Sequence, residues 1–238
     1  MGRKAQSDAE RQAKRLEIVE VAARLFQDLP YPSITMAMIA REAGVAKGTV
    51  YLYFRTKEEL FLQLLLDRLQ GWFAEYAPVL LALSGPMHPR DLAAILAKAA
   101  TTRPDLIRLI ALLHAVLEQN ISVDQAREFK RRLLAFSLGF GGELERVFPV
   151  FRPGDGLHFC LYYYSIVVGL HQMSTPAPDV VEALDTPELR VMLIDFESHL
   201  AGILTGLLGG WWVGAAPHVP NMAFLQDLDG VSQKPIDG

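Results

Sequence analysis

The sequence predicts an all-α protein of about nine helices. Apolar residues recur at helical spacing through most of the chain, and no stretch shows the strict alternation of a half-buried strand. No long-period repeat is present either. Hydrophobic residues make up 51% of the 238 positions, which is enough for a substantial core. We expect a small three-helix N-terminal head, fused by a long helix to a larger helical body.

The N-terminal part begins with a polar segment. We expect residues 1–10 to form a flexible arm carrying Arg3 and Lys4, which is either solvated or lies along a nucleic-acid groove. The first helix is predicted from Ala9 to Asp28 and ends before the breaker PYPS. This N-terminus has no apolar signal region, and a single cysteine allows no intrachain disulfide, so we expect a cytosolic protein.

Residues 35–54 have the pattern of two short helices joined by a tight turn. Met36, Ile39 and Ala40 repeat at helical spacing, and Gly44 follows where a helix ends with positive φ. A second short helix begins near Ala46. A helix, a short turn containing glycine and a second helix are typical of the helix-turn-helix motif, whose second helix enters the DNA major groove.

The second of these helices has an unusual polar face. Lys47, Gly48, Thr49 and Tyr51 are short, hydroxylated or cationic, which suits close approach to phosphates and base edges. Glycine costs about 1 kcal/mol against alanine in a helix, so Gly48 indicates that something comes close to the backbone there. We expect Val50 and Phe54, four residues apart, to face inward.

The stretch GVAKGTVYLYFRTKEELF resembles the TetR-type helix-turn-helix, whose usual form is close to GVSKGTLYHYFxSKEEL. The motif resemblance covers Leu16 to about Phe61, and the remainder is similar to that family in architecture. Ala46 departs from the pattern, because the family often has a serine that caps the recognition helix. Loss of such a cap weakens the helix by about 1 kcal/mol and could remove a phosphate contact.

The resemblance implies a homodimeric transcriptional regulator, in particular a repressor, that binds a near-palindromic double-stranded DNA operator. Lys47 and Tyr53 would contact phosphate, while Thr49 and Tyr51 would lie near base edges. The two tyrosines could instead pack inside the head. The full set of implied DNA-contacting positions is Thr35, Ala46, Lys47, Gly48, Thr49, Tyr51, Tyr53 and Lys57.

Charge is distributed unevenly along the chain. Residues 1–57 carry ten Lys or Arg against six Asp or Glu, a balance of +4, and the remainder carries thirteen against twenty-one, a balance of −8. A basic head on an acidic body suits phosphate binding at one end of the protein. Chance asymmetry is the alternative explanation.

The body is predicted to consist of longer helices. Thr56 begins a fourth helix as its N-cap, Glu59 completes a capping box, and the helix continues to Pro78. Ser122 and Gln125 form a second capping box, and Thr186-Pro-Glu188 is a strong helix start. The later helices are expected at 90–101, 104–119, 122–148, from 154 to before Pro176, and from 186 onward.

The last predicted helix runs into an uncharged segment. No charged residue lies between Glu197 and Asp227, but the glycines, His199 and the amphipathic start argue against a membrane span, and we expect no membrane partner. Gly202, Gly206 and Gly210 recur every four residues, which allows close helix approach. The resemblance implies dimerisation through the last two long helices. The expected domains are a DNA-binding head at 1–57, an effector and dimerisation body at 58–211, and a tail at 212–238.

No residue cluster predicts an enzyme. The six histidines have no metal-ligand spacing, and neither a nucleophile elbow nor a phosphate loop occurs, so we expect no metal and no cofactor. Cys160, the single cysteine, is expected to be a buried structural thiol. Two alternatives stay open. One is a helical interaction protein whose head no longer recognises DNA, and the other is an enzyme with its active site in the helical body.

The resemblance also implies an apolar pocket for a small-molecule effector in the body. The candidate lining residues carry no formal charge, which indicates an apolar or weakly polar effector. Each of them could instead be an ordinary core residue, and His114 in particular could be a satisfied core or interface histidine. The candidates are Trp72, Tyr76, His114, Phe136 and Tyr163.

Overall fold

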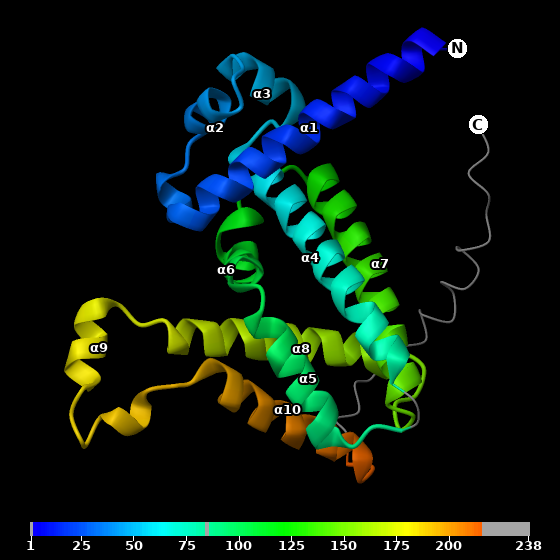
Figure 1. Cartoon of the computed structure of the whole chain (residues 1–238), viewed down its shortest axis with the longest axis vertical. Helices are drawn as coiled ribbons and strands as arrows, with labels where there is room; N and C mark the ends of the chain where they lie inside the picture. Colours follow the sequence, from blue (N-terminus) through cyan, green and yellow to red (C-terminus); the bar gives the residue numbers. More distant parts are fainter. Residues whose placement is uncertain (1, 84–85, 216–238) are drawn as a thin grey trace. The chain divides into compact units, whose positions relative to one another are not determined.

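The computed structural model describes residues 2–83 and 86–215, and within them it has ten α-helices and no strand (Figure 1). The predicted all-α fold is confirmed. The described residues divide into two compact units. Unit 1 comprises those within Met1–Trp72 and Arg103–Leu134, and unit 2 those within Phe73–Thr102 and Ala135–Gly238.

Unit 1 is built around the N-terminal helices. Its core contains Ile18, Val50 and Phe61, which are fully buried, and the Phe61 ring meets those of Phe26 and Tyr31 edge-on at 5.5 and 4.9 Å between centroids. Large apolar side chains of this kind supply most of the burial free energy of a small helical unit. Its elements are α1 Gly2–Asp28, α2 Met36–Glu42, α3 Lys47–Tyr53, the first part of α4 Lys57–Ala82, α6 Pro104–Leu112 and the first part of α7 Val123–Val147.

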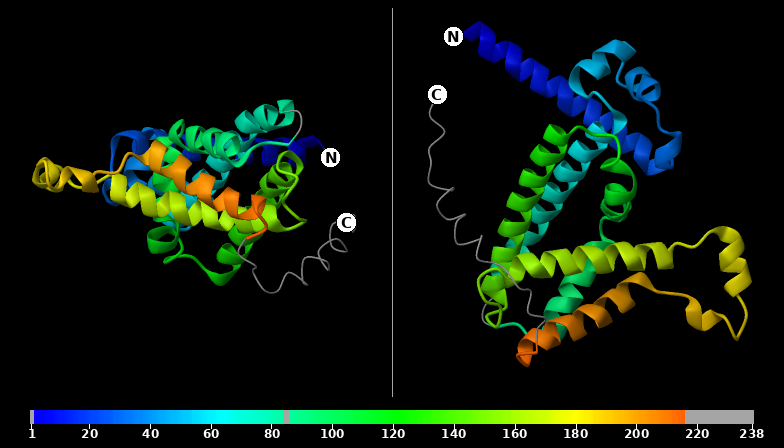
Figure 2. Two further views of the ribbon diagram at one scale, coloured as in Figure 1. Left: turned by 90° about the horizontal axis from the view of Figure 1, so that it is seen from below. Right: turned by 180° about the vertical axis from the view of Figure 1, so that it is seen from behind.

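Unit 2 contains the remaining helices. Helix α10 packs along α5, and Leu200, Leu204 and Leu208 form its fully buried stripe. Helix α8 runs beside α10, as both views of Figure 2 show. The elements are the last parts of α4 and α7 together with α5 Pro89–Thr101, α8 Asp155–Ser174, α9 Pro178–Leu184 and α10 Phe196–Trp212.

Two glycines allow α7 and α8 to meet backbone to backbone. A Cβ atom on Gly156 would overlap the carbonyl group of Gly141, and a Cβ on Gly141 would lie 2.7 Å from the Gly156 carbonyl carbon. The Glu145 carboxylate accepts hydrogen bonds from the backbone N–H groups of Gly154 and Gly156, at 2.8 and 3.0 Å. Glycine is therefore required at this crossing for space.

The predicted helix starts at Thr56 and Ser122 are confirmed. The Thr56 hydroxyl accepts from the Glu59 backbone N–H at 3.1 Å, although the Glu59 carboxylate accepts from Arg55, one residue further back than a capping box requires. Ser122 and Gln125 form the full reciprocal box, at 2.8 and 3.3 Å.

Two predicted helix ends were wrong. Helix α1 begins at Gly2, so residues 2–10 extend the helix rather than forming an irregular arm. Helix α4 continues past Pro78 to Ala82. The cost of the interior proline is offset there because Leu80 is buried, and its carbonyl accepts a hydrogen bond from Arg146 of α7 at 2.8 Å.

The predicted helix at 104–119 is regular only to Leu112. A π-helical turn, Leu113–Leu117, follows it, and the Glu118 N–H donates to the Leu113 carbonyl five residues back at 3.1 Å. The extra residue in this turn changes the direction of the side chains that follow it.

The predicted helix beginning at Thr186 was also wrong. Thr186 does accept a hydrogen bond from Leu189 N–H at 3.2 Å, but only a 3₁₀ turn at Arg190–Met192 follows. No residue of α9 or of this turn is buried, and a short helix without a buried face gains little in water. The last long helix instead begins at Phe196, capped by Asp195.

The predicted tail at 212–238 lies outside the described residues beyond position 215. In the described ranges, no helix combines the length and the apolar character that crossing a membrane requires. These ranges also contain no group of three or more His, Cys, Asp or Glu side chains arranged to hold a metal ion.

Candidate DNA-binding interface

Helix α2 begins at a side-chain cap. The Thr35 hydroxyl accepts a hydrogen bond from the Met38 backbone N–H at 3.2 Å, as expected for an N-cap threonine. Met36, Ile39 and Ala40 are buried and hold the helix against the rest of unit 1. Thr35 itself is exposed, at a helix N-terminus where backbone N–H groups favour an anion.

The turn between α2 and α3 has the predicted form. Gly44 has a φ of 63°, and its N–H donates to the Arg41 carbonyl at 3.1 Å. The Val45 N–H donates to the Ala40 carbonyl at 3.0 Å, closing the turn. Because a left-handed residue costs little only for glycine, Gly44 fixes where α2 ends and how α3 leaves it.

Helix α3 has one buried and one exposed face. Val50 and the following Phe54 are fully buried, as predicted. Lys47, Gly48 and Tyr51 lie on the exposed face. Ala46 occupies the N-cap position in an extended conformation and provides no side-chain hydrogen bond.

Gly48 has open space where its side chain would be. A Cβ atom built there has no neighbouring atom within 4 Å, and the residue does not need a positive φ. Internal packing and backbone conformation therefore do not explain a glycine inside α3. The absent side chain leaves room for a partner from outside.

The two tyrosines of α3 differ in exposure. Tyr51 is 43% exposed, and the Lys47 ammonium lies 5.8 Å from the centre of its ring. Tyr53 is half-buried, and so is Thr49. Lys47 and Tyr51 thus share the outer face, one turn apart.

Lys57 has partners inside unit 1. Its ammonium donates to the backbone carbonyls of Tyr31 and Ile34, at 2.9 and 2.8 Å, and lies 3.9 Å from the centre of the Tyr31 ring. Burial lowers the pKa of this ammonium, with the nearby Glu58 charge acting in the opposite direction. The side chain ties the start of α4 to the segment between α1 and α2.

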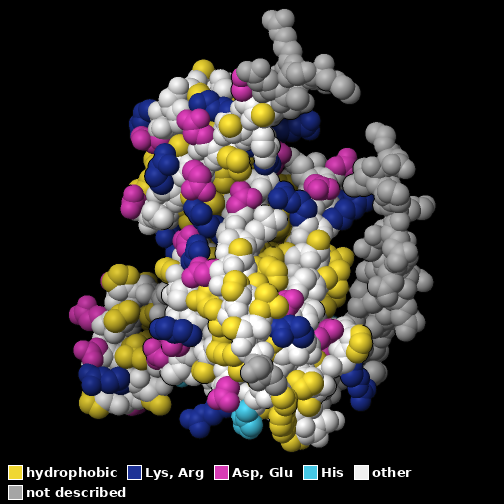
Figure 3. Space-filling model, turned by 45° about the vertical axis from the view of Figure 1, so that its right-hand side comes forward, with side chains coloured by type: hydrophobic (Ala, Val, Ile, Leu, Met, Phe, Trp, Pro, Cys, Tyr) yellow, Lys and Arg dark blue, Asp and Glu magenta, His cyan; other side chains and the backbone are white. Residues whose placement is uncertain are grey.

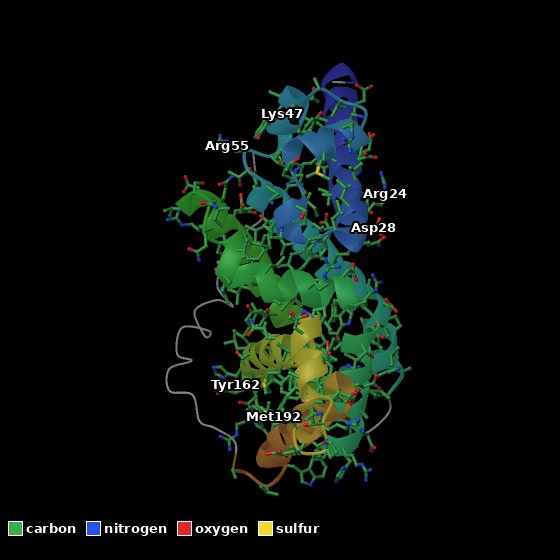
Figure 4. The ribbon with its side chains drawn as sticks, turned by 90° about the vertical axis from the view of Figure 1, so that its left-hand side faces the viewer. Arg24, Asp28, Lys47, Arg55, Tyr162 and Met192 are labelled. Carbon is green, nitrogen blue, oxygen red and sulfur yellow. The ribbon has the colours of Figure 1, made fainter. Side chains whose placement is uncertain are left out.

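Arg55 was not predicted as a contact residue. It is exposed in the turn after α3, and Figure 4 shows it on the same side of the head as Lys47, opposite Arg24 and Asp28 of α1. Its position immediately after the motif, beside a helix start, is the signal that could have identified it. Lys47 and Arg55 give this side two exposed positive charges.

The five predicted effector-pocket residues are divided between the two units. In unit 1, Trp72 is buried, whereas His114 is exposed and its imidazole lies 2.9 Å from the Glu118 carboxylate. Burial alone would raise the pKa of Glu118, but Lys130, at 2.6 Å, and His114 together hold it below its ordinary value.

In unit 2 the predicted residues lie among other side chains. The Tyr76 and Thr102 hydroxyls are 3.0 Å apart, and the Tyr163 hydroxyl donates to the Leu96 carbonyl at 3.0 Å. Phe136 meets the Phe73 ring edge-on at 5.9 Å. Burial raises the pKa of the Tyr163 hydroxyl, so it stays protonated and acts as a donor.

Cys160 also lies in unit 2, on α8. Its thiol donates to the Ser137 carbonyl at a sulfur–oxygen distance of 3.7 Å. Burial raises the pKa of the thiol to about 12, which disfavours the reactive thiolate.

Comparison with known sequences identifies the family. The sequence model described as "Bacterial regulatory proteins, tetR family" matches residues 18–64, which include α2 and α3. A second, described as "Tetracyclin repressor-like, C-terminal domain", matches residues 66–214. The chain belongs to the TetR family. It is accordingly a DNA-binding transcriptional regulator, and the predicted resemblance is confirmed.

Individual relatives match over shorter segments. The fatty acid metabolism regulator protein of Bacillus subtilis (strain 168) is 33% identical over 66 residues, and the HTH-type transcriptional repressor KstR2 of Mycolicibacterium smegmatis is 31% identical over 75. These segments are 28% and 32% of this chain and span 34% and 37% of the two relatives.

Solved structures share the fold of this TetR-family chain. A TetR transcriptional regulator from Rhodococcus sp. RHA1 has a TM-score of 0.54 at 17% identity, covering 84% of this chain and 97% of that one. A TetR/AcrR-family regulator from Thermobifida fusca YX-ER1 has a TM-score of 0.51 at 17% identity, covering 82% and 96%.

Proposed function

We propose that this TetR-family protein is a homodimeric repressor that binds a near-palindromic operator through α3 and is released by a small, apolar effector. The observation that carries the proposal is the two-sided character of α3. Val50 is fully buried, whereas Lys47, Gly48 and Tyr51 face outward with open space over Gly48. A short exposed helix that presents the Lys47 ammonium and the Tyr51 hydroxyl, with no side chain at Gly48, suits the DNA major groove.

Each predicted contact residue has a role in this proposal. Lys47 and Tyr53 contact phosphates, Thr49 and Tyr51 lie at base edges, and Ala46 and Gly48 let the backbone approach the DNA. Thr35, the N-cap of α2, and Lys57, the first residue of α4, lie at helix N-termini, where backbone N–H groups attract phosphate. The Lys57 ammonium keeps its two carbonyl partners. Arg55 adds a further phosphate contact.

A second copy is required because an operator with two half-sites needs two heads. We place the dimer contact on α8 and α10. Leu161 of α8 is 57% exposed and Ile203 of α10 is 44% exposed, and added Cβ atoms at Gly202 and Gly206 meet nothing within 4 Å in the chain. On the side of the molecule seen in Figure 3, hydrophobic side chains also reach the surface between charged ones. Such surface is stabilised when a partner covers it.

We place the effector site in unit 2, at the predicted residues Tyr76, Phe136 and Tyr163, whereas the predicted residues Trp72 and His114 belong to unit 1 and are left out of it. Effector binding would favour a state in which the two heads no longer fit both half-sites. The shift in this equilibrium can be no larger than the difference between the effector's affinities for the two states. The domain limits stay as predicted, with a head at 1–57, a body at 58–211 and a tail from 212. We place the protein in the cytoplasm, where its operator would be.

Selection from a randomised DNA duplex library, with purified protein at near-physiological salt, tests the proposal. The expected result is an enriched palindrome with half-sites about one helical turn apart. A folded, dimeric protein that enriches nothing, with co-purified ligand excluded, would instead favour an interaction protein that retains the fold.

The selected operator then allows a matched test of α3. Lys47→Ala should weaken binding to all sequences and reduce the salt dependence of the affinity by about one ion. Arg24→Ala removes the same charge from the opposite side of the head and should leave both properties nearly unchanged. Equal effects of the two variants would show that general charge, rather than the α3 face, attracts DNA.

A further inference from the structure

An open cavity of about 480 Å³ lies within unit 1, between α1, α4 and the start of α7. Its polar wall contains Arg15, Gln63 and Arg132, and its apolar wall contains Leu62, Leu66 and Phe129. None of these six residues belongs to the predicted DNA-binding or effector sites, but Arg55, to which we assign a phosphate contact, also lines the cavity. The volume lies in the range of small-molecule sites, about 300–1,000 Å³.

Gln63 holds the centre of the polar wall. Its side chain is 6% exposed, and among the described residues it is the one polar side chain that is buried. Its side-chain oxygen accepts hydrogen bonds from both guanidinium groups, from Arg15 at 2.9 Å and from Arg132 at 2.8 Å. Its amide nitrogen donates to the Asp67 carboxylate at 2.6 Å.

The two arginines share this neutral acceptor, and the Asp67 carboxylate, which accepts from the Gln63 amide nitrogen, acts electrostatically on both without a direct ion pair. In the part of the chain that the structure describes, neither Arg15 nor Arg132 has a carboxylate within ion-pair distance. Burial lowers the pKa of Arg15, with Asp67 acting against it and Arg132 acting with it. A guanidinium has five N–H donors, and the hydrogen bonds to Gln63 use one donor of each arginine.

The carboxylates around the cavity have partners or lie at its edge. The Glu59 carboxylate accepts from the Arg55 backbone, Asp124 pairs with Arg127 at 2.8 Å, and Glu128 is exposed. These three carboxylates and the guanidinium groups of Arg15, Arg55 and Arg132 line the cavity together, so its lining has no excess positive charge to favour a multiply charged anion. A single negative charge attached to an apolar group fits this lining best.

We propose that this cavity binds the carboxylate of a small amphipathic monoacid. The carboxylate lies on the guanidinium groups of Arg15 and Arg132, because the planar arginine donor pattern matches a carboxylate. The apolar part packs on Leu62, Leu66 and Phe129. The ligand oxygen takes over donors that now point at the Gln63 amide, which is a weaker acceptor than an anion.

A ligand in the cavity can affect α3 through one contact. The Arg15 guanidinium lies 4.7 Å from the centre of the Phe54 ring, and Phe54 directly follows α3. A ligand that repositions Arg15 therefore changes what supports the DNA-reading helix. This regulatory consequence rests on the proposed function, whereas ligand binding itself does not.

Calorimetric titration of the full-length protein with hexanoate, at constant ionic strength, tests the binding. We expect saturable binding of one hexanoate per chain, and affinity for the neutral analogue hexanamide lower by about tenfold or more. Arg132→Gln should weaken hexanoate binding by about tenfold, while the control Arg131→Gln, an exposed neighbour with the same charge change, should alter it by less than about twofold. Equal binding of hexanamide, equal losses in both variants or no saturable binding would overturn the proposal.

Gln63→Ala provides a second test should Arg132→Gln fail to fold. It keeps both arginines and removes the acceptor that competes with the ligand. The melting temperature should fall, and hexanoate, unlike hexanamide or chloride, should raise it again towards that of the unsubstituted protein. A purely structural role of Gln63 predicts no rescue by hexanoate, and that result would contradict the proposal. Neither experiment contains DNA, so their failure is distinguishable from failure of the operator selection.

Discussion

Gly48→Ala should change stability and DNA binding in opposite directions. Alanine is favoured over glycine inside a helix by about 0.5–1 kcal/mol. The new methyl group meets no atom of the chain within 4 Å, so no steric cost opposes this gain. For a chain of this size the melting temperature should rise by about 1–4 °C.

The same methyl group lies on the face that we propose approaches DNA. Losing or lengthening one contact there costs about 1–2 kcal/mol, which corresponds to roughly five- to thirtyfold weaker operator binding. Urea or thermal unfolding measures the first effect, and fluorescence anisotropy with the selected operator measures the second. Both should be compared at equal protein concentration, because dimerisation affects apparent stability.

Gly71→Ala is the matched control. Gly71 is an exposed glycine inside α4, and its added Cβ also has no neighbour within 4 Å. It should stabilise the protein similarly and leave operator binding unchanged. The reasoning about α3 would be refuted if Gly48→Ala raised stability while operator affinity stayed at the level of this control.

Three further substitutions test other contacts. Lys57→Met leaves the Tyr31 and Ile34 carbonyls without their ammonium donor and should lower the free energy of unfolding by about 1–3 kcal/mol in urea titrations. Gly156→Ala places a methyl group onto the Gly141 carbonyl and should destabilise unit 2 by about 1–3 kcal/mol or more, seen as a lower melting temperature. Glu118 has a lowered pKa in the folded protein, so its contribution to stability is present above the ordinary glutamate value of about 4.3 and is lost as the pH falls. Glu118→Gln should therefore flatten the acid side of the stability–pH profile, which unfolding measurements across that range would detect.

The head was predictable from sequence because local chemistry determines its form. Gly44 permits the turn, and the spacing of Val50 and Phe54 defines the buried face of α3. Thr56 marks the start of α4 for a similar local reason. Each of these signals acts over four residues or fewer, so the printed sequence contains all of it.

The segment between α8 and α10 shows where such local signals fail. Thr186, Pro187 and Glu188 have the composition of a strong helix start, and the Thr186 hydroxyl does form its capping bond. The helix nevertheless does not propagate, because no residue of the following turn is buried. A cap lowers the cost of starting a helix, but burial of an apolar face is what sustains it.

The Arg15–Gln63–Arg132 cluster could not be found by pattern, because its members are 48 and 69 residues apart in the chain. In sequence, Gln63 is one polar residue within the apolar run of α4, where the ordinary interpretation is an exposed position. The structure instead buries it and brings two guanidinium groups from α1 and α7 to one oxygen. The Gln63 amide lies between these two positive charges and the Asp67 carboxylate, and its neutral oxygen stabilises the guanidinium groups less than a direct ion pair with an anion would. The arrangement at the junction of α1, α4 and α7 is therefore suited to reversible binding of an anion. A carboxylate at position 63 would pair with both arginines permanently and would prevent that binding.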